Sequence, residues 1–114
     1  MKKINIVKNN YDFERIIRNN KPFVYKNFLI YKEINQDNYH FGISVSKHIC
    51  NAVGRNKIKR QIRSIIDKYN YKQNFNCIII VRKSILNSDY EEMQRQLDFC
   101  FNKINILKEN KDEK

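Results

Sequence analysis

The stretch NAVGRNKIKRQIR, residues 51–63, is the most informative segment of this chain because it opens a helix with two unlike sides. From here to residue 69, apolar residues recur at intervals of three and four, which places them on one side of an α-helix. They are Ile58, Ile62, Ile65, Ile66 and Tyr69. We therefore expect a helix over residues 52–69 that packs this stripe against a core.

The other side of the predicted helix is basic. At about 100° per residue, Arg55, Lys59, Arg63 and Arg60 fall within an arc of about 140°, which also contains Asn56. Residues 47–63 hold six Lys and Arg and no carboxylate. Arg offers a planar fork that matches phosphate oxygens in pairs, and Asn can bond base edges or sugar hydroxyls. This side suits folded RNA better than a membrane, which would favour an exposed apolar face.

Length and composition indicate one folded, basic domain. A chain of 114 residues, 41% of them hydrophobic, can bury one core, so we expect a single domain over 1–107 and a frayed polar tail over 108–114. The net charge of +11 favours a nucleic-acid partner. The codon bias of an A+T-rich genome is an alternative explanation for the amount of lysine, but it does not explain the clustering.

The cysteines and the N-terminal segment indicate a reducing compartment. Cys50, Cys77 and Cys100 are far apart and have no close Cys or His pair, so no zinc site is expected. The apolar run near the N-terminus is broken by polar residues, and the longest apolar run, 77–81, is too short to cross a bilayer. We expect a cytoplasmic protein that has no membrane partner.

The N-terminal third predicts a helix and then a strand. The helix begins near Asn10, a favourable N-cap. Aromatic and branched residues over 22–32 predict one strand, with Tyr25, Leu29 and Tyr31 on one of its faces.

Three further elements are predicted around the basic helix. Residues 39–46 alternate apolar and polar side chains, which predicts a second strand that pairs antiparallel with the first. Residues 75–81 are apolar on both faces, as in a central strand. A last helix opens with a capping box formed by Ser88 and Glu91. Its core positions are Met93, Leu97, Cys100, Phe101 and Ile104.

The segment GISVSKHICNAVGRNKIKRQIR, residues 42–63, resembles the signature of the bacterial ribonuclease P protein component, in which Arg, Asn and a basic residue lead into a basic helix. The stretches YDFERI, FLIY, and CIIIVRK followed by DYEEM also occur in the family's order, so the resemblance covers nearly the whole chain. It implies an α+β fold, a small central mixed sheet packed with helices in an α-β sandwich like that of ribosomal-protein domains. It also implies a left-handed β-α-β crossover, against the usual right-handed rule.

The resemblance implies an RNA-binding subunit of ribonuclease P, the endoribonuclease that removes the 5′ leader from precursor tRNA. The family places the catalytic centre and its magnesium in the RNA subunit, so no catalytic residue, metal site or tightly bound cofactor is expected in this chain. The absence of a paired-carboxylate, HxxxH or Cys–His arrangement in the sequence agrees with that expectation. The expected partners are ribonuclease P RNA and precursor tRNA, with one protein per RNA.

The resemblance also implies two surfaces. One, the basic face, matches the signature and is expected to contact the catalytic RNA through Lys47, Asn51, Arg55, Asn56, Lys57, Lys59, Arg60 and Arg63. The other, the leader cleft, lies between the first helix and the sheet, where single-stranded leader would stack on aromatic rings. Its matching residues are Phe13, Ile17 and Tyr31.

Several positions depart from the family pattern or carry a plainer explanation. Ile17 stands where an aromatic is common, His48 where a basic residue is usual, and Cys50 where glycine is usual. Lys57 replaces a frequent Arg and could be a solvated lysine, and Phe13 could be a simple core residue. Two other classes stay open: a structural ribosomal or general RNA-binding protein that lacks a leader cleft, and a protein-only nuclease, which would require a metal site.

Overall fold

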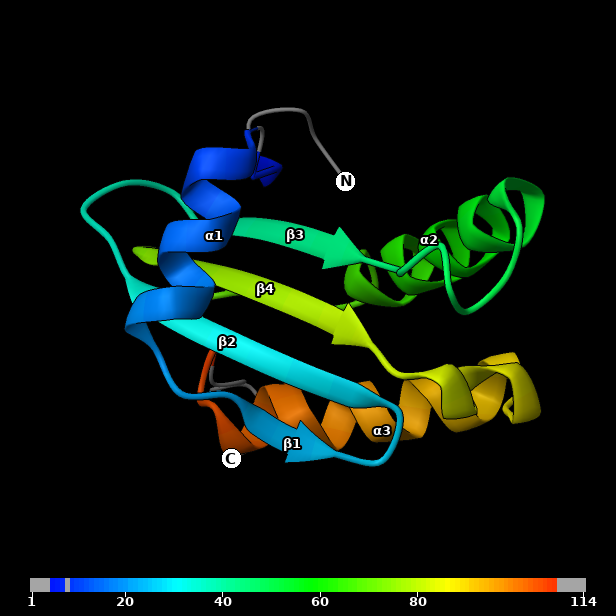
Figure 1. The fold of residues 1–114 in the computed structure, drawn as a ribbon. Helices are drawn as coiled ribbons and strands as arrows, with labels where there is room; N and C mark the ends of the chain where they lie inside the picture. Colours follow the sequence, from blue (N-terminus) through cyan, green and yellow to red (C-terminus); the bar gives the residue numbers. More distant parts are fainter. Residues whose placement is uncertain (1–4, 8, 109–114) are drawn as a thin grey trace, which may run out of the picture.

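The computed structural model describes residues 5–7 and 9–108. The elements are α1 (Asn10–Asn19), β1 (Phe23–Tyr25), β2 (Phe28–Ile34), β3 (His40–Ser44), α2 (Ala52–Ile66), β4 (Phe75–Val81), the 3-10 helix η2 (Lys83–Asn87) and α3 (Tyr90–Lys103). The four strands form one sheet in the order β1-β2-β4-β3. Helix α1 covers one face of the sheet, and α2 and α3 cover the other (Figure 1). The expected α+β class, a mixed sheet packed with helices, is confirmed.

The connection from β3 through α2 to β4 is a left-handed crossover. β3 and β4 pair in parallel. In Figure 1 both strands point to the right with β4 below β3, while α1 crosses in front of the sheet and α2 packs on the opposite face. A right-handed crossover would require α2 on the near face. The predicted exception to the handedness rule is therefore present.

The segment 22–32 is not one strand, as the sequence pattern predicted, but a hairpin. Tyr25 pairs with Phe28 at its end, and Lys26 has a φ of 51°, in the left-handed region. The reversal carries Tyr25 to the α3 side, where its ring stacks on Phe99 with centroids 4.3 Å apart. Leu29 faces α1, so the predicted grouping of Tyr25 with Leu29 and Tyr31 was wrong.

The predicted antiparallel pairing of the second strand with its predecessor was also wrong. β4 pairs antiparallel with β2 on one side and parallel with β3 on the other, so it separates them. Because β4 contacts strands on both edges and helices on both faces, its sequence is apolar at nearly every position. The prediction of 75–81 as a central strand is confirmed.

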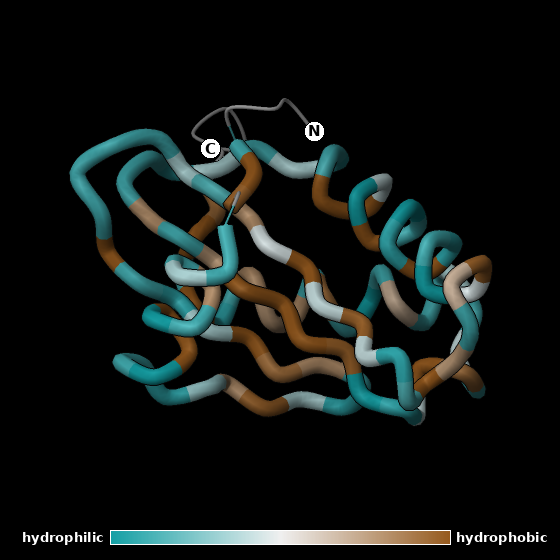
Figure 2. The backbone as a smooth tube through the Cα atoms, turned by 45° about the horizontal axis from the view of Figure 1, so that its top comes forward, coloured by the Kyte–Doolittle hydropathy of each residue, from teal (hydrophilic) through white to brown (hydrophobic). Residues whose placement is uncertain are grey.

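The two faces of the sheet carry cores of very different size. Between the sheet and α2 with α3, nineteen described residues form one buried cluster, in which the rings of Phe41, Tyr71, Phe75 and Phe101 meet. Under α1, the buried residues are Ile16, Tyr31 and Ile78. Figure 2 shows the apolar segments running along the strands and polar segments along the connecting loops. The stability of the domain therefore rests mainly on the α2–α3 side.

Three helix ends differ slightly from the sequence prediction. The N-cap of α1 is Asn9 rather than Asn10, since Asn9 has an extended backbone and its side chain accepts from the Asp12 amide. α3 is capped by Asp89 rather than by the predicted Ser88 and Glu91 box: the Asp89 side chain accepts from the amide of Glu92, while the Ser88 hydroxyl accepts from the Asn27 side chain. α2 ends at Ile66 instead of residue 69.

The stripes of α2 and α3 are core, as predicted. The buried members are Ile58, Ile62, Ile65, Ile66, Met93, Leu97, Cys100 and Phe101. Tyr69 and Ile104 are half-buried and lie just beyond their helices.

The C-terminal end of the described chain is attached to the domain. The Lys108 amide donates to the Asn70 carbonyl at 3.0 Å. The rest of the predicted tail, 109–114, lies outside the described residues. Within the described part of the chain, no helix combines the length and the apolar character needed to span a membrane.

Candidate nucleic-acid interface

The basic face begins where Asn51 caps α2. The Asn51 side-chain oxygen accepts from the Gly54 amide at 2.9 Å, which satisfies one of the free amides at the helix start. Asn51 is exposed, but its amide oxygen already has this partner. The sequence pattern predicted only RNA contact for Asn51, although Asn directly before a helix is a common cap signal.

Arg55 is held against the loop that precedes α2. One guanidinium nitrogen donates to the Cys50 carbonyl at 2.9 Å, and the side chain is half-buried. A guanidinium carries five N–H donors, so this bond leaves capacity for phosphate oxygens. Cys50 itself packs tightly on Gly54, since a Cβ on that glycine would lie 2.9 Å from the Cys50 sulfur. The departure at Cys50 is thus accommodated by a glycine one helical turn later.

The remaining predicted contacts lie along the outer side of α2 and the loop before it. The exposed ones are Lys47, Asn56, Lys57, Arg60 and Arg63, and Lys59 is half-buried. The apolar stripe is turned to the core, so the basic side stays in solvent. His48 is also exposed, and its amide donates to the Ser46 hydroxyl.

Lys57 and Lys59 point to opposite edges of α2. Lys57 lines a groove of about 380 Å³ whose other wall includes Ile85 and Leu86 of η2. Lys59 lines a hollow of about 440 Å³ on the α1 side, together with Phe13. The sequence pattern predicted that Lys59 contacts only the catalytic RNA, whereas the structure also places it beside Phe13, one of the three residues predicted for the leader.

The leader-cleft residues gather on the α1 face of the sheet. The Phe13 ring lies directly over Gly42, where a Cβ would be only 2.5 Å from a ring carbon. Phe13 and Ile17 are half-buried, and Tyr31 is 9% exposed. The structure therefore brings the three predicted residues together, with Phe13 and Ile17 offering more surface than Tyr31.

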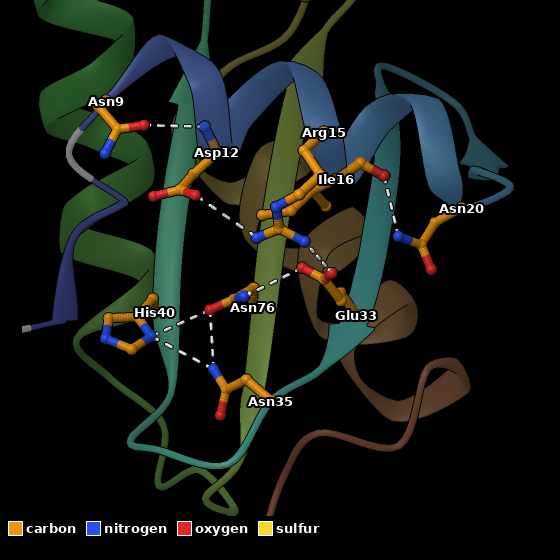
Figure 3. Close-up of polar contacts among 9 residues, drawn as sticks. All are labelled: Asn9, Asp12, Arg15, Ile16, Asn20, Glu33, Asn35, His40 and Asn76. Atoms are coloured by element: carbon orange, nitrogen blue, oxygen red, sulfur yellow. Dashed lines mark hydrogen bonds and ion pairs between the residues drawn. The ribbon is translucent and has the colours of Figure 1, made fainter.

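A polar network on the same face escaped the sequence analysis. Arg15 of α1 forms an ion pair with Glu33 of β2 (Figure 3). The hydrogen bond with Glu33 is the main factor that raises the pKa of Arg15, while partial burial opposes it. The two residues are eighteen positions apart, and nothing local in the sequence links them.

The described residues contain no group of three or more His, Cys, Asp or Glu side chains that could hold a metal ion. The two buried thiols, Cys77 and Cys100, are part of the large core between the sheet and the helices α2 and α3. Burial raises the pKa of Cys100 to about 12 and also raises the pKa of Cys77.

The fold and the helix define the class: a small α+β domain with a left-handed crossover that presents a basic helical face without a carboxylate. The family model for ribonuclease P matches residues 1–105. The chain is 36% identical to the ribonuclease P protein component of Mycoplasma mobile over 96% of this chain and 97% of that one. It is 40% identical to the protein of Mycoplasma capricolum, over 97% and 100%.

A solved structure agrees with these sequence relatives. A Staphylococcus aureus RNase P protein mutant, described as having defective mRNA degradation activity, superposes with a TM-score of 0.83 and 31% identity over 92% of each chain. The chain belongs to the ribonuclease P protein component family. Membership makes it a subunit of a tRNA-processing enzyme whose partner is ribonuclease P RNA.

Proposed function

We propose that this chain binds the catalytic RNA of ribonuclease P through the basic face and the 5′ leader of precursor tRNA through the leader cleft. In this way it assists endonucleolytic removal of the leader to give the mature tRNA 5′ end. One observation carries the proposal: the side chain of Lys59 extends from α2 and lines the same hollow as Phe13. Catalytic RNA bound along α2 would therefore lie beside the cleft that receives the precursor-tRNA leader.

The electrostatics of α2 support the contact with catalytic RNA. No carboxylate interrupts residues 47–63, and Arg60 and Arg63 are exposed on the solvent side of a helix whose other side is fixed in the core. Each phosphate that such a face neutralises releases counterions, which favours binding. The rigid helix also holds the arginine backbones at fixed spacing. Binding therefore costs conformational entropy of the side chains but little of the backbone.

The cleft chemistry supports a single-stranded ligand. Phe13 presents part of its ring, and Ile17 adds apolar surface beside it. Unpaired bases stack on such surfaces without a strong sequence requirement. Ile17 in place of an aromatic residue offers apolar contact rather than stacking, so we expect weaker selection of leader bases.

The proposal also covers the division of labour in the enzyme. The catalytic centre and its magnesium ions are in the RNA subunit, and this chain holds no cofactor tightly. One protein assembles with one RNA in the cytoplasm. Native mass spectrometry of the reconstituted particle measures this stoichiometry directly, and a two-to-one mass would contradict it.

The test of the proposed function is cleavage of precursor tRNA by ribonuclease P RNA at low magnesium, with and without this chain. Substrates with long and one-nucleotide leaders are compared. The proposal predicts that the chain restores cleavage and that the long leader is bound more tightly. If the chain restores cleavage but shows no preference for the long leader, the cleft does not bind the leader.

The alternative, a general RNA-binding protein without a leader role, draws support from the 9% exposure of Tyr31. It predicts RNA binding with no change in cleavage. Incubation of the chain with magnesium and no RNA subunit tests the remaining class, a protein-only nuclease, and cleavage in that arm would contradict our proposal.

A further inference from the structure

The polar network beside α1 joins five parts of the fold (Figure 3). Arg15 pairs with one oxygen of Glu33, and the other oxygen accepts from the Asn76 amide at 3.1 Å. The Asn76 carbonyl oxygen in turn accepts from Asn35 at 2.8 Å and lies 3.0 Å from His40 Nδ1. The chain of contacts thus runs from α1 through β2 and β4 to β3 and the loop after β2.

A hollow of about 480 Å³ adjoins this network, lined in part by Arg15, His40 and Asn76. The side chains of the network bond to one another. Among the described residues, no buried side-chain nitrogen or oxygen lacks a hydrogen-bond partner. A ligand would have to displace these bonds, so the arrangement fits a structural link better than a binding site.

The geometry of α1 shows what this link can control. Successive helical residues are about 100° apart, so Ile16 points to the sheet, where it is fully buried. Phe13 and Ile17 then lie on one flank of the helix, and Arg15 lies on the opposite flank. A roll of α1 about Ile16 would move Arg15 away from Glu33 and shift both leader-cleft residues.

The apolar packing that resists such a roll is small: Phe13 lies over Gly42, and Phe13 and Ile17 pack against a cluster with few buried members. α1 is a ten-residue helix, a length that is marginal in isolation, and its buried cluster contains only Ile16, Tyr31 and Ile78 among the described residues. The Asp12–Arg15 contact at 3.6 Å lies within α1. The Arg15–Glu33 pair, by contrast, fastens the helix to the sheet.

We propose that Arg15 and Glu33 are positioning residues for the leader cleft, whose ion pair fixes the roll of α1 and thereby places Phe13 and Ile17 for the leader. This inference rests on the proposed function and deepens it. Neither residue touches the leader; each acts through the orientation of α1. Both side chains are partly exposed, 29% and 20%, and such pairs add little to global stability. The effect should therefore appear in leader affinity rather than in the unfolding temperature.

The experiment uses the reconstituted enzyme, with ribonuclease P RNA present, and measures affinity for precursors with long and one-nucleotide leaders. Arg15→Ala and Glu33→Ala should each weaken long-leader binding by about three- to tenfold and leave one-nucleotide-leader binding unchanged. The double variant should be no worse than either single variant, because the two side chains act as one unit. Arg15→Lys, which keeps the charge, should recover part of the loss.

Arg95→Ala is the matched control, since it also removes one positive charge. Arg95 pairs with Glu92 within α3, on the other side of the sheet, so this variant should retain the full leader preference. Equal losses for both leaders in the Arg15 and Glu33 variants, or additive losses in the double variant, would overturn the inference.

The two proposals fail in distinguishable ways. If the unmodified chain shows no preference for the long leader, the leader role itself is wrong. If the unmodified chain shows the preference and both single variants keep it in full, the leader role stands and the positioning role is wrong.

Discussion

The two faces of the sheet differ in how they are held together. The face under α2 and α3 is closed by a large aromatic and aliphatic core. The face under α1 is closed by a cluster of three buried residues and a polar link. The residues predicted for the leader cleft lie on the face with the smaller core, where Phe13 and Ile17 keep part of their surface exposed.

Under the proposed function, the face with the small core receives the leader, while the large core on the opposite face supplies most of the stability. Side chains that stabilise the fold are shielded from water, so they are unavailable to a ligand. Side chains that meet a ligand must keep exposed surface and so contribute less to stability. α2 has both roles, since its isoleucines stabilise the core and its arginines face solvent, where they can meet a ligand.

The largest expected effect is on the α2–α3 side. Phe101→Ala should lower the free energy of unfolding by about 3–5 kcal/mol, because Phe101 is fully buried and its ring meets Phe41, Tyr69 and Tyr71. Denaturant unfolding measures this loss. Phe13→Ala should cost clearly less, and an equal cost would remove the distinction between the two faces.

Gly42→Ala tests how Phe13 is seated. The added methyl would lie 2.5 Å from a Phe13 ring carbon and 2.8 Å from Ile78 Cδ1, so the Phe13 ring and the Ile78 side chain must move. We expect a loss of about 1–3 kcal/mol in the free energy of unfolding, as in other overpacked sites, together with weaker long-leader binding. Unfolding and leader-affinity measurements check both. If stability and leader affinity are unchanged, the contact between Phe13 and Gly42 does not determine the position of Phe13 in the cleft.

Alkaline unfolding should report the α2–α3 side. Burial raises the pKa of Cys100 from 9.0 to about 12, and that of Tyr69 from 10.0 to about 12. The folded state therefore keeps these protons when the unfolded state loses them, and stability falls as pH rises above about 9. Each such group contributes about 1.4 kcal/mol per pH unit in this range. In Cys100→Ala, denaturant unfolding from pH 8 to 11 should show a shallower decline, and an unchanged decline would exclude Cys100 as a source.

The smallest effect concerns one phosphate contact of the basic face. If that face meets roughly five phosphates, log affinity for ribonuclease P RNA should fall steeply with log salt, and Arg60→Ala should make the slope shallower by about one unit. Filter binding at several salt concentrations measures the slope. Arg95→Ala on α3 is the charge-matched control and should leave it unchanged. The same change in both variants would show that net charge, not the α2 face, sets the affinity.

The sequence predicted the elements whose signal is local. The isoleucine spacing in α2 and the continuous apolar run of β4 located both elements to within a few residues. The hairpin was missed because its turn has no Gly, and Lys26 rather than the following Asn27 takes the left-handed φ. The order of strands was missed because β4 inserts between β2 and β3 from a distant part of the chain.

The candidate site follows the same division. Membership of the basic face could be read from helical spacing, since Arg60 and Arg63 share one side of one helix. The place of Lys59 beside Phe13 depends on how α1 and α2 meet β3, and the pairing of Arg15 with Glu33 depends on how α1 lies on β2. Neither contact could be predicted from the spacing of residues along the sequence.

The most direct test of the account compares Phe13→Ala with Arg60→Ala in the reconstituted enzyme. Two quantities are measured for each: affinity of the protein for ribonuclease P RNA, and the ratio of long-leader to one-nucleotide-leader affinity at saturating protein. The account predicts that Phe13→Ala lowers only the leader ratio and that Arg60→Ala lowers only the affinity for RNA. If both variants lower the same quantity, the chain does not carry two separate RNA-binding surfaces.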